Sequence, residues 1–339
     1  MNQQTHAWIA LRATALLEDA GENPQLVRLL STYAKDAAVG AWLPDLKSAK
    51  LGRSDVDNHI FKMKPLPPDD PQASRFIANR QALTKRLGPA RLVSQYLKQP
   101  EQLPEAWWAT PYKAEAKPGQ HIPNCVMGLR LTLTDLLLMG DSQLQILIPG
   151  EVEFVRKLHA EARTPGQQAA LYFFMISHFV ADACMPCHCD ARKLASYAAG
   201  LHQKLEEHWG DTVGKYYKDT KLPQCADSPD QILKKARETG DGFDLAFKNS
   251  VPKIPQGRDA WLEMVDVCRG SFALACIMVP FKAGEPATKC KFDDVFGGAA
   301  GKQLLADVDR IAMHDAVLNT AIVWKEVWND FVELEKRQE

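Results

Sequence analysis

The sequence has no long apolar run. No stretch of eighteen or more consecutive apolar residues occurs among its 339 residues, whereas a transmembrane helix needs about 20. The first residues, Met1 to His6, also have neither the basic nor the apolar region of a secretory signal peptide. The sequence alone therefore predicts no membrane-spanning segment and no export signal.

An excess of charge of one sign is also missing. The chain has 41 Lys and Arg residues against 42 Asp and Glu residues, which gives a formal net charge of −1. Proteins that coat nucleic acid or membrane surfaces carry clustered basic charge, so we expect no stable nucleic-acid partner. An anionic substrate would have to be held by a local feature such as a bound metal.

Strand-type alternation is scarce, and apolar residues instead recur every three or four positions, as in amphipathic helices. The length and the 46% hydrophobic content permit a sizeable core. No internal repeat or sharp change of composition divides the chain. We therefore predict an all-α fold, with one multi-helix domain over residues 1–339 and an insertion within 64–150. Helices are expected at 5–18, 25–38, 73–96 (in two pieces), 151–162, 166–183, 191–209, 229–239, 258–278 and 304–336, and loops at 64–71 and 99–124.

The chain has eight cysteines, many for a reducing compartment, but their uneven spacing does not describe a small disulfide-stapled scaffold. Cys184, Cys187 and Cys189 surround His188. They leave open a Cys₃His structural zinc site and a redox Cys-x-x-Cys pair. We favour a third interpretation, in which these thiols pack or form disulfides, because no βαβ pattern surrounds the Cys-x-x-Cys pair.

The most informative feature is a group of histidines and acids in the middle of the chain. His178 and Asp182 are four residues apart, and so are His202 and Glu206. Residues four apart share one face of a helix, so each pair is arranged to bind one metal ion. His188 lies between the two pairs, and all five side chains can therefore converge.

Pro186 supports this convergence. A proline ends the preceding helix, so we expect His188 to lie on the turn that follows. Imidazoles and carboxylates together suit Zn²⁺ better than Ca²⁺ or Mg²⁺, which prefer oxygen ligands. A single His and acid pair would more often be a surface hydrogen bond, but two pairs with a linking histidine favour zinc.

Three further candidate ligands, His6, Asp45 and His59, lie in the N-terminal part of the sequence. Each alone would be read as a surface polar residue. Taken in order with the central group, they resemble the zinc-dependent phospholipase C and S1/P1 nuclease superfamily. That pattern runs from an N-terminal residue and an early histidine through an aspartate and a histidine to H-x-x-x-D-x-x-x-P-x-H and H-x-x-x-E/D. In this sequence it falls on Met1, His6, Asp45, His59, His178, Asp182, Pro186, His188, His202 and Glu206.

The resemblance implies a cleft that holds three zinc ions. It also implies a secreted or periplasmic protein, although the sequence shows no signal peptide. Relatives usually begin with a processed tryptophan, and Met1 would replace it through main-chain atoms alone. The implied ligand sets are Asp45, His59, His178 and Asp182 for one zinc; His188, His202 and Glu206 for the second; and Met1, His6 and the shared Asp182 for the third.

The activity implied by the resemblance is hydrolysis of phosphodiester P–O bonds by a water that bridges two zinc ions. Asp45 is either a direct ligand or the base that orients this water, and Asp182 is the shared carboxylate. Single-stranded nucleic acid or nucleotides are the substrates we expect first, and phospholipid is the alternative. Phe61 is a candidate platform for a base, although a place in the core explains it equally well.

Two non-enzymatic interpretations remain open. One is a metal-binding helical protein whose cleft is filled by the insertion, and the other is a helical protein stabilised by one structural zinc. The sequence does not predict the oligomeric state.

Overall fold

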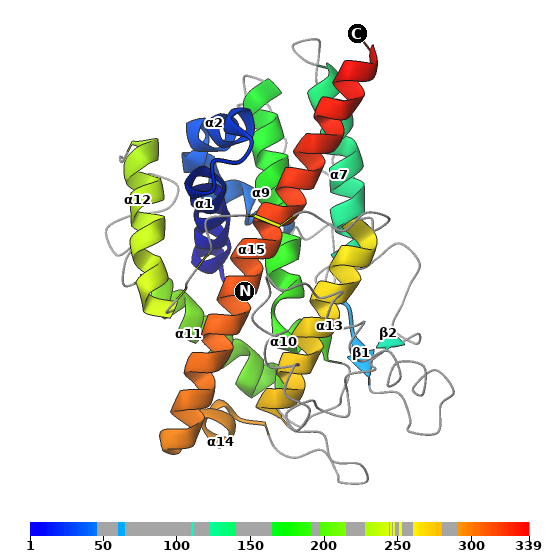
Figure 1. Ribbon diagram of the computed structural model, residues 1–339. Coiled ribbons are helices and arrows are strands. Elements are labelled where there is room, and N and C mark those ends of the chain that lie inside the picture. Colours follow the sequence, from blue (N-terminus) through cyan, green and yellow to red (C-terminus); the bar gives the residue numbers. More distant parts are fainter. Residues whose placement is uncertain are drawn as a thin grey trace.

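The computed structural model describes residues 1–45, 60–64, 110–111, 122–139, 165–190, 197–214, 228–243, 245, 247, 251–252, 260–279 and 290–338. This part of the chain is predominantly helical (Figure 1), in agreement with the predicted all-α character. The α-helices are α1 (Gln3–Asp19), α2 (Pro24–Thr32), α3 (Ala37–Gly40), α7 (Ile122–Met139), α9 (Pro165–Ala183), α10 (Pro186–Cys189), α11 (Gln203–Gly214), α12 (Pro229–Thr239), α13 (Ala260–Met278), α14 (Phe292–Phe296) and α15 (Gly298–Gln338).

Short elements connect some of these helices. They are the 3₁₀ turns η1 (Ala34–Asp36), η2 (Leu43–Asp45) and η8 (Gly240–Phe243), and a π-helical turn, η7 (Tyr197–His202). Strands β1 (Met63–Lys64) and β2 (Thr110–Pro111) form one short antiparallel pair, in which Met63 faces Pro111. Among the described helices, none combines the length and the apolar character that crossing a bilayer requires.

Helix α9 lies at the centre of the bundle. It packs against α1, α3, α7 and α15, and all its residues from Gln168 to Ala183 are buried. The 41-residue helix α15 crosses the whole bundle beside it (Figure 1), a length of about 60 Å at 1.5 Å per residue. The helix predicted at residues 166–183 is confirmed.

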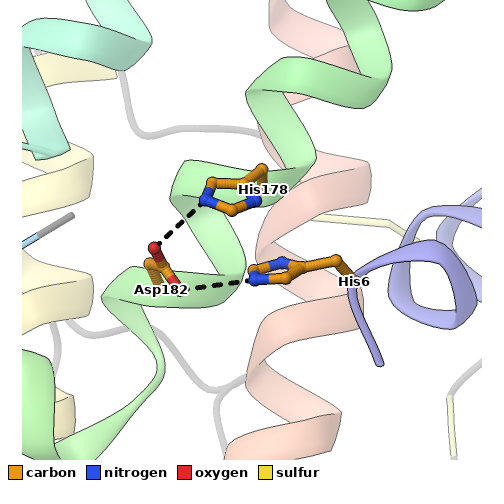
Figure 2. Close-up of side chains that lie close together, drawn as sticks. All are labelled: His6, His178 and Asp182. Atoms are coloured by element: carbon orange, nitrogen blue, oxygen red, sulfur yellow. Dashed lines mark ion pairs between the residues drawn. The ribbon is translucent and has the colours of Figure 1, made fainter. Parts of the chain in front are cut away.

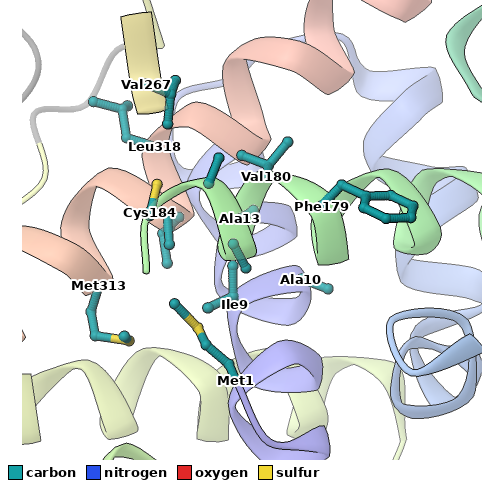
Figure 3. Packing of buried hydrophobic residues seen from close by; sticks show 14 of the residues in the cluster. Met1, Ile9, Ala10, Ala13, Phe179, Val180, Cys184, Val267, Met313 and Leu318 are labelled. Carbon is teal, nitrogen blue, oxygen red and sulfur yellow. The ribbon is translucent and has the colours of Figure 1, made fainter. Parts of the chain in front are cut away.

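A single apolar cluster draws on most of these helices. In Figure 3, Ile9 of α1, Val180 of α9, Val267 of α13 and Leu318 of α15 point into the same region, and the side chain of Met1 joins them. Each buried side chain of this size contributes about 1.5–3 kcal/mol relative to an exposed one. The N-terminus is therefore anchored by apolar packing as well as by its amine.

Several helix ends follow signals in the sequence. Asn2 caps α1, because its Oδ1 accepts a hydrogen bond from the Thr5 amide at 3.0 Å. Gly21, at φ +64°, ends the same helix in a left-handed conformation that favours glycine. At the start of α12, Ser228 and Gln231 each bond the other's amide, which forms a capping box.

Two predicted elements were wrong in extent. The helix expected at 25–38 is divided into α2, η1 and α3. The Thr32 hydroxyl donates to the Arg28 carbonyl at 2.7 Å, and such side-chain bonds compete with the helix backbone near its end.

Helix α7 was not predicted, and its start overlaps the loop expected at 99–124. Its segment Leu129-Arg-Leu-Thr-Leu-Thr134 alternates apolar and polar residues, a pattern of strands rather than helices.

Other expectations cannot be compared with the structure. The helices predicted at 73–96 and 151–162 lie outside the described residues, and so does most of the insertion predicted within 64–150.

Gly40 allows α3 to lie directly against α9. A Cβ atom at Gly40 would come within 2.7 Å of the Phe174 Cβ, closer than non-bonded carbons approach. The following residue, Ala41, accepts a hydrogen bond from His178 Nδ1 at 2.7 Å. The close helix approach therefore positions a carbonyl against this histidine.

We expect Gly40→Ala to lower the free energy of unfolding by about 1–3 kcal/mol, because the added methyl group overpacks the contact between α3 and α9. Gly128→Ala is the matched control. Gly128 is an exposed residue of α7 with nothing within 4 Å of the added Cβ, so the better helix propensity of alanine should stabilise it by up to about 1 kcal/mol. Denaturant unfolding measures both, and equal stabilities of the two variants would contradict the packing argument.

Candidate metal centre

Asp182 lies at the centre of a cluster of polar side chains at the end of α9. His178, one turn earlier, faces it, with 3.3 Å between His178 Nε2 and Asp182 Oδ2 (Figure 2), as the four-residue spacing predicts. The bond from His178 Nδ1 to the Ala41 carbonyl places the ring proton on Nδ1. With the proton on Nδ1 held by this carbonyl, Nε2 is the ring nitrogen that faces the carboxylate and could bind a metal ion.

His6 approaches the other oxygen of Asp182. His6 Nε2 lies 3.5 Å from Asp182 Oδ1, and the ring stacks on that of His178 with 3.9 Å between centroids (Figure 2). Within the described part of the chain, neither ring nitrogen of His6 has a hydrogen-bond partner, although the residue is only 1% exposed. A buried polar group without a partner is costly. A metal ion between His6 and Asp182 would give Nε2 of His6 a partner.

The ring of His6 is held in its neutral form. Burial, together with His178 and the terminal amine, keeps the pKa of His6 well below its ordinary value, although Asp182 acts in the opposite direction. A neutral imidazole is the form that coordinates a metal ion.

The terminal amine of Met1 contacts both carboxylates of the cluster. It lies 3.3 Å from Asp182 Oδ1 and 2.9 Å from Glu206 Oε1. Burial alone would lower the pKa of this amine, but the two carboxylates outweigh burial and raise the pKa to about 10. Gly210 of α11 makes room for the N-terminal segment, because a Cβ there would overlap the Asn2 side-chain amide.

A second group is formed by His188, His202 and Glu206. The distance from His202 Nε2 to Glu206 Oε1 is 2.9 Å, that between the two histidine Nε2 atoms is 3.0 Å, and that from His188 Nε2 to Glu206 Oε1 is 3.7 Å. Tetrahedral zinc with bonds of about 2.0–2.1 Å separates its ligand atoms by about 3.3 Å. The three distances bracket this value, so the group fits a zinc ion.

The local backbone explains how His202 reaches this position. His202 ends the π-helical turn η7 and Glu206 lies in the first turn of α11. Such wider turns are frequent at functional sites. The sequence predicted a regular helix from 191 to 209, so the pairing of the two side chains was predicted but the π turn was not.

His188 stands between the two groups. Its Nδ1 lies 3.4 Å from Asp182 Oδ1 while its Nε2 faces the second group. Burial lowers the pKa of His188 to about 4, although Asp182 and Glu206 act in the opposite direction. His188 is therefore neutral above this pH.

The carboxylates of Asp182 and Glu206 are held in their charged form. Burial alone would raise the pKa of Asp182 and of Glu206. The terminal amine and the neighbouring histidines outweigh burial and hold both pKa values well below their ordinary range. Neutral imidazoles and charged carboxylates are the states that bind a metal ion.

Asp45 lies at the edge of the cluster. Its Oδ1 is 3.8 Å from His178 Nε2, and its side chain is 35% exposed. The predicted ligand His59 lies outside the described residues. The structure thus brings together eight of the predicted ligands, namely Met1, His6, Asp45, His178, Asp182, His188, His202 and Glu206.

Phe61 belongs to the hydrophobic core, with 6% of its surface exposed. Its amide donates to the His188 carbonyl at 3.2 Å. The surroundings of Phe61 agree with the alternative interpretation, a place in the core. Its role as a platform for a base stays a prediction.

The described thiols near the cluster take no part in either ligand group. Cys184, Cys187 and Cys189 are buried, and the Cys189 thiol donates to the Ala183 carbonyl at 3.4 Å. Sequence reasoning missed the Ala41 carbonyl and Gly210, because main-chain acceptors and close approaches leave no residue-type signal.

A scan against protein-family models found no match for this chain, and neither did a search of curated proteins. The resemblance described above therefore depends on the residues, their order and their spacing.

The pKa of His188 predicts how the stability of the metal-free protein varies with pH. The unfolded chain takes up a proton on this histidine near pH 6.5, and the folded protein only near pH 4. Stability should therefore be lost as the pH falls through this window, by up to about 3 kcal/mol from His188. Urea unfolding of the metal-free protein at pH 7, 6 and 5 measures the loss.

His188→Gln is the control, since it removes this proton uptake. The variant should lose less stability than the wild type over the same interval. Identical pH dependence in the two proteins would contradict the burial argument.

Proposed function

We propose that the protein is a zinc-dependent phosphoesterase that hydrolyses P–O bonds. The observation that carries this proposal is the position of Asp182. Its Oδ2 faces His178, and its Oδ1 faces His6, the Met1 amine and His188. A carboxylate with both oxygens directed at separate sets of nitrogen ligands is suited to bridge two metal ions.

The donor atoms support zinc. Imidazole nitrogens and carboxylate oxygens at tetrahedral separations match the ligands of catalytic zinc sites. We assign one ion to Asp45, His178 and Asp182 with His59, a second to His188, His202 and Glu206, and a third to Met1, His6 and Asp182. When bound there, zinc would neutralise phosphate charge and lower the pKa of water toward about 7.

The exposed edge of the cluster gives a substrate access. The side chains of Asp45, His202 and Glu206 are 35%, 28% and 26% exposed, whereas those of His6 and His178 are fully buried. A phosphodiester can therefore approach the exposed residues, while the buried ones fix the geometry beneath it. Fixed positions lower the entropic cost of bringing the reacting groups together.

Asp45 is the proposed catalytic residue at this edge. Its carboxylate either binds a metal directly or accepts the proton of the attacking water at one of its oxygens, and the 3.8 Å distance to His178 Nε2 is compatible with both. Asp182 positions the ligand side chains on both sides of its carboxylate.

Single-stranded nucleic acid or nucleotides are the substrates we propose, and phospholipid is the alternative. The further alternative is a metal-binding protein without turnover. Two measurements separate these proposals. Hydrolysis of a phosphodiester distinguishes the enzyme from a metal-binding protein without turnover. More than one bound zinc per chain distinguishes both from a protein with a single structural zinc.

We expect zinc-loaded protein to hydrolyse bis-p-nitrophenyl phosphate and a single-stranded oligonucleotide. The zinc ions needed for hydrolysis depend on the buried ligands, so His178→Ala should lose activity on every substrate. Chromophore release and product analysis are the measurements. Cleavage of phosphatidylcholine alone would transfer the assignment to the phospholipase alternative, and no cleavage of any of the three substrates would refute the enzyme proposal.

Two carboxylate variants test the shared role of Asp182. Asp182→Asn should weaken two zinc ions and Glu206→Gln one, because we assign Asp182 as a ligand of two ions and Glu206 as a ligand of one. Loss of a residue that contacts a ligand but not the metal lowers metal affinity by about 10–100-fold. Loss of a ligand itself should lower each affected zinc affinity by more than this. Elemental analysis and zinc titration measure the effect.

His208→Gln is the matched control on the same helix as Glu206. His208 bonds Asp309 at 2.7 Å and belongs to neither ligand group, so its variant should retain wild-type zinc content. Equal zinc loss from the two carboxylate variants would show that Asp182 is not shared.

A further inference from the structure

The short helix α10, which carries His188, depends on contacts from outside itself. Its four residues are too few to bond all their own carbonyl groups. The His188 amide donates to the carbonyl of Met185, the residue that precedes α10, at 2.9 Å. The carbonyl side is bonded by a distant segment, residues 60–64.

Two consecutive residues of that segment bind two consecutive carbonyls of α10. The Phe61 amide donates to the His188 carbonyl at 3.2 Å, and Lys62 Nζ donates to the Cys187 carbonyl at 2.6 Å. A lysine at the carbonyl end of a helix is favourable, because its charge complements the carbonyl dipoles. The pair of contacts therefore fixes both the position and the direction of the turn.

The ligand on this turn has little freedom. His188 lies with Nδ1 3.4 Å from Asp182 and Nε2 3.0 Å from His202 Nε2. A metal site tolerates displacements of only about 0.5 Å, so a shift of the α10 backbone would take Nε2 out of reach of a shared ion. The contact from Lys62 acts on the residue directly before this ligand.

We propose that Lys62 is a positioning residue for the metal group of His188, His202 and Glu206. Its ammonium group holds the Cys187 carbonyl and so keeps His188 Nε2 directed at the other two ligands. This inference rests on the proposed function, since it assumes that the group binds zinc. The segment also follows directly after the predicted ligand His59 in the sequence.

Zinc titration of metal-free protein against a chromophoric chelator tests the proposal, with Co²⁺ absorption spectra as a second readout. Lys62→Met removes the donor and should lower the affinity of one zinc by about 10–100-fold, as loss of an outer partner does. Lys62→Arg keeps a charged donor and should remain within a few-fold of wild type. The Co²⁺ spectrum of Lys62→Met should lose the contribution of one site.

His202→Ala identifies which zinc is affected. If Lys62 acts only on the His188 group, adding Lys62→Met to His202→Ala should leave the remaining zinc affinities unchanged. Lys325→Met is the matched control for a general loss of stability. Lys325 also donates to a main-chain carbonyl, that of Val251 at 2.9 Å, and it pairs with Glu22 at 2.6 Å, but among the described residues neither contact involves a proposed ligand.

The outcomes separate the two proposals. Wild-type zinc affinities in Lys62→Met overturn this inference and leave the proposed function standing. Equal weakening of every zinc, with a thermal midpoint lowered as in Lys325→Met, also overturns it, because Lys62 would then serve only general stability. If His202→Ala titrates like the wild type, the His188 group binds no zinc and both proposals fail.

Discussion

The buried carboxylate of Asp182 is the constraint on which the rest of the site depends. A charge removed from water is stable only when it is paired and hydrogen-bonded, and here the groups that contact it come from α1, α9, α10 and the chain terminus. Placing one negative charge at the end of the central helix therefore requires the N-terminal segment and α10 to meet α9 there. The apolar packing of α1 against α9 and α15 brings these segments into position.

The same constraint explains why histidines surround the carboxylate. His6 and His188 are buried, and burial keeps both neutral, so they cannot compensate the negative charge of Asp182 and Glu206 as cations. Among the described residues, the terminal amine is a positive group that contacts both acids. Divalent cations would add positive charge beside these acids and would also give one ring nitrogen of His6 a partner.

Much of this centre could be predicted from the sequence, because the information is local. The pairs His178 with Asp182 and His202 with Glu206 depend only on helical spacing, and both pairs meet in the structure. The central helix was recognisable from its apolar residues, and the end of α1 from Gly21. The order of ligands along the chain suggested that the N-terminal residues join them.

The remainder depends on tertiary contacts that leave no pattern in the sequence. The Ala41 carbonyl that orients His178 is a main-chain atom, brought close by the approach at Gly40. The π turn before His202 and the contact of Lys62 with α10 arise from long-range packing. Helix α7 was hidden by an alternating segment that resembles a strand, and packing against α9 and α13 overrides this local preference.

The most direct test of the account is anomalous X-ray diffraction at the zinc edge from crystals of zinc-loaded protein. The account predicts three peaks, two of them on either side of the Asp182 carboxylate and one within about 2.0–2.2 Å of donor atoms from His188, His202 and Glu206. A single peak bound by cysteine thiols, or no peak near Asp182, would contradict it.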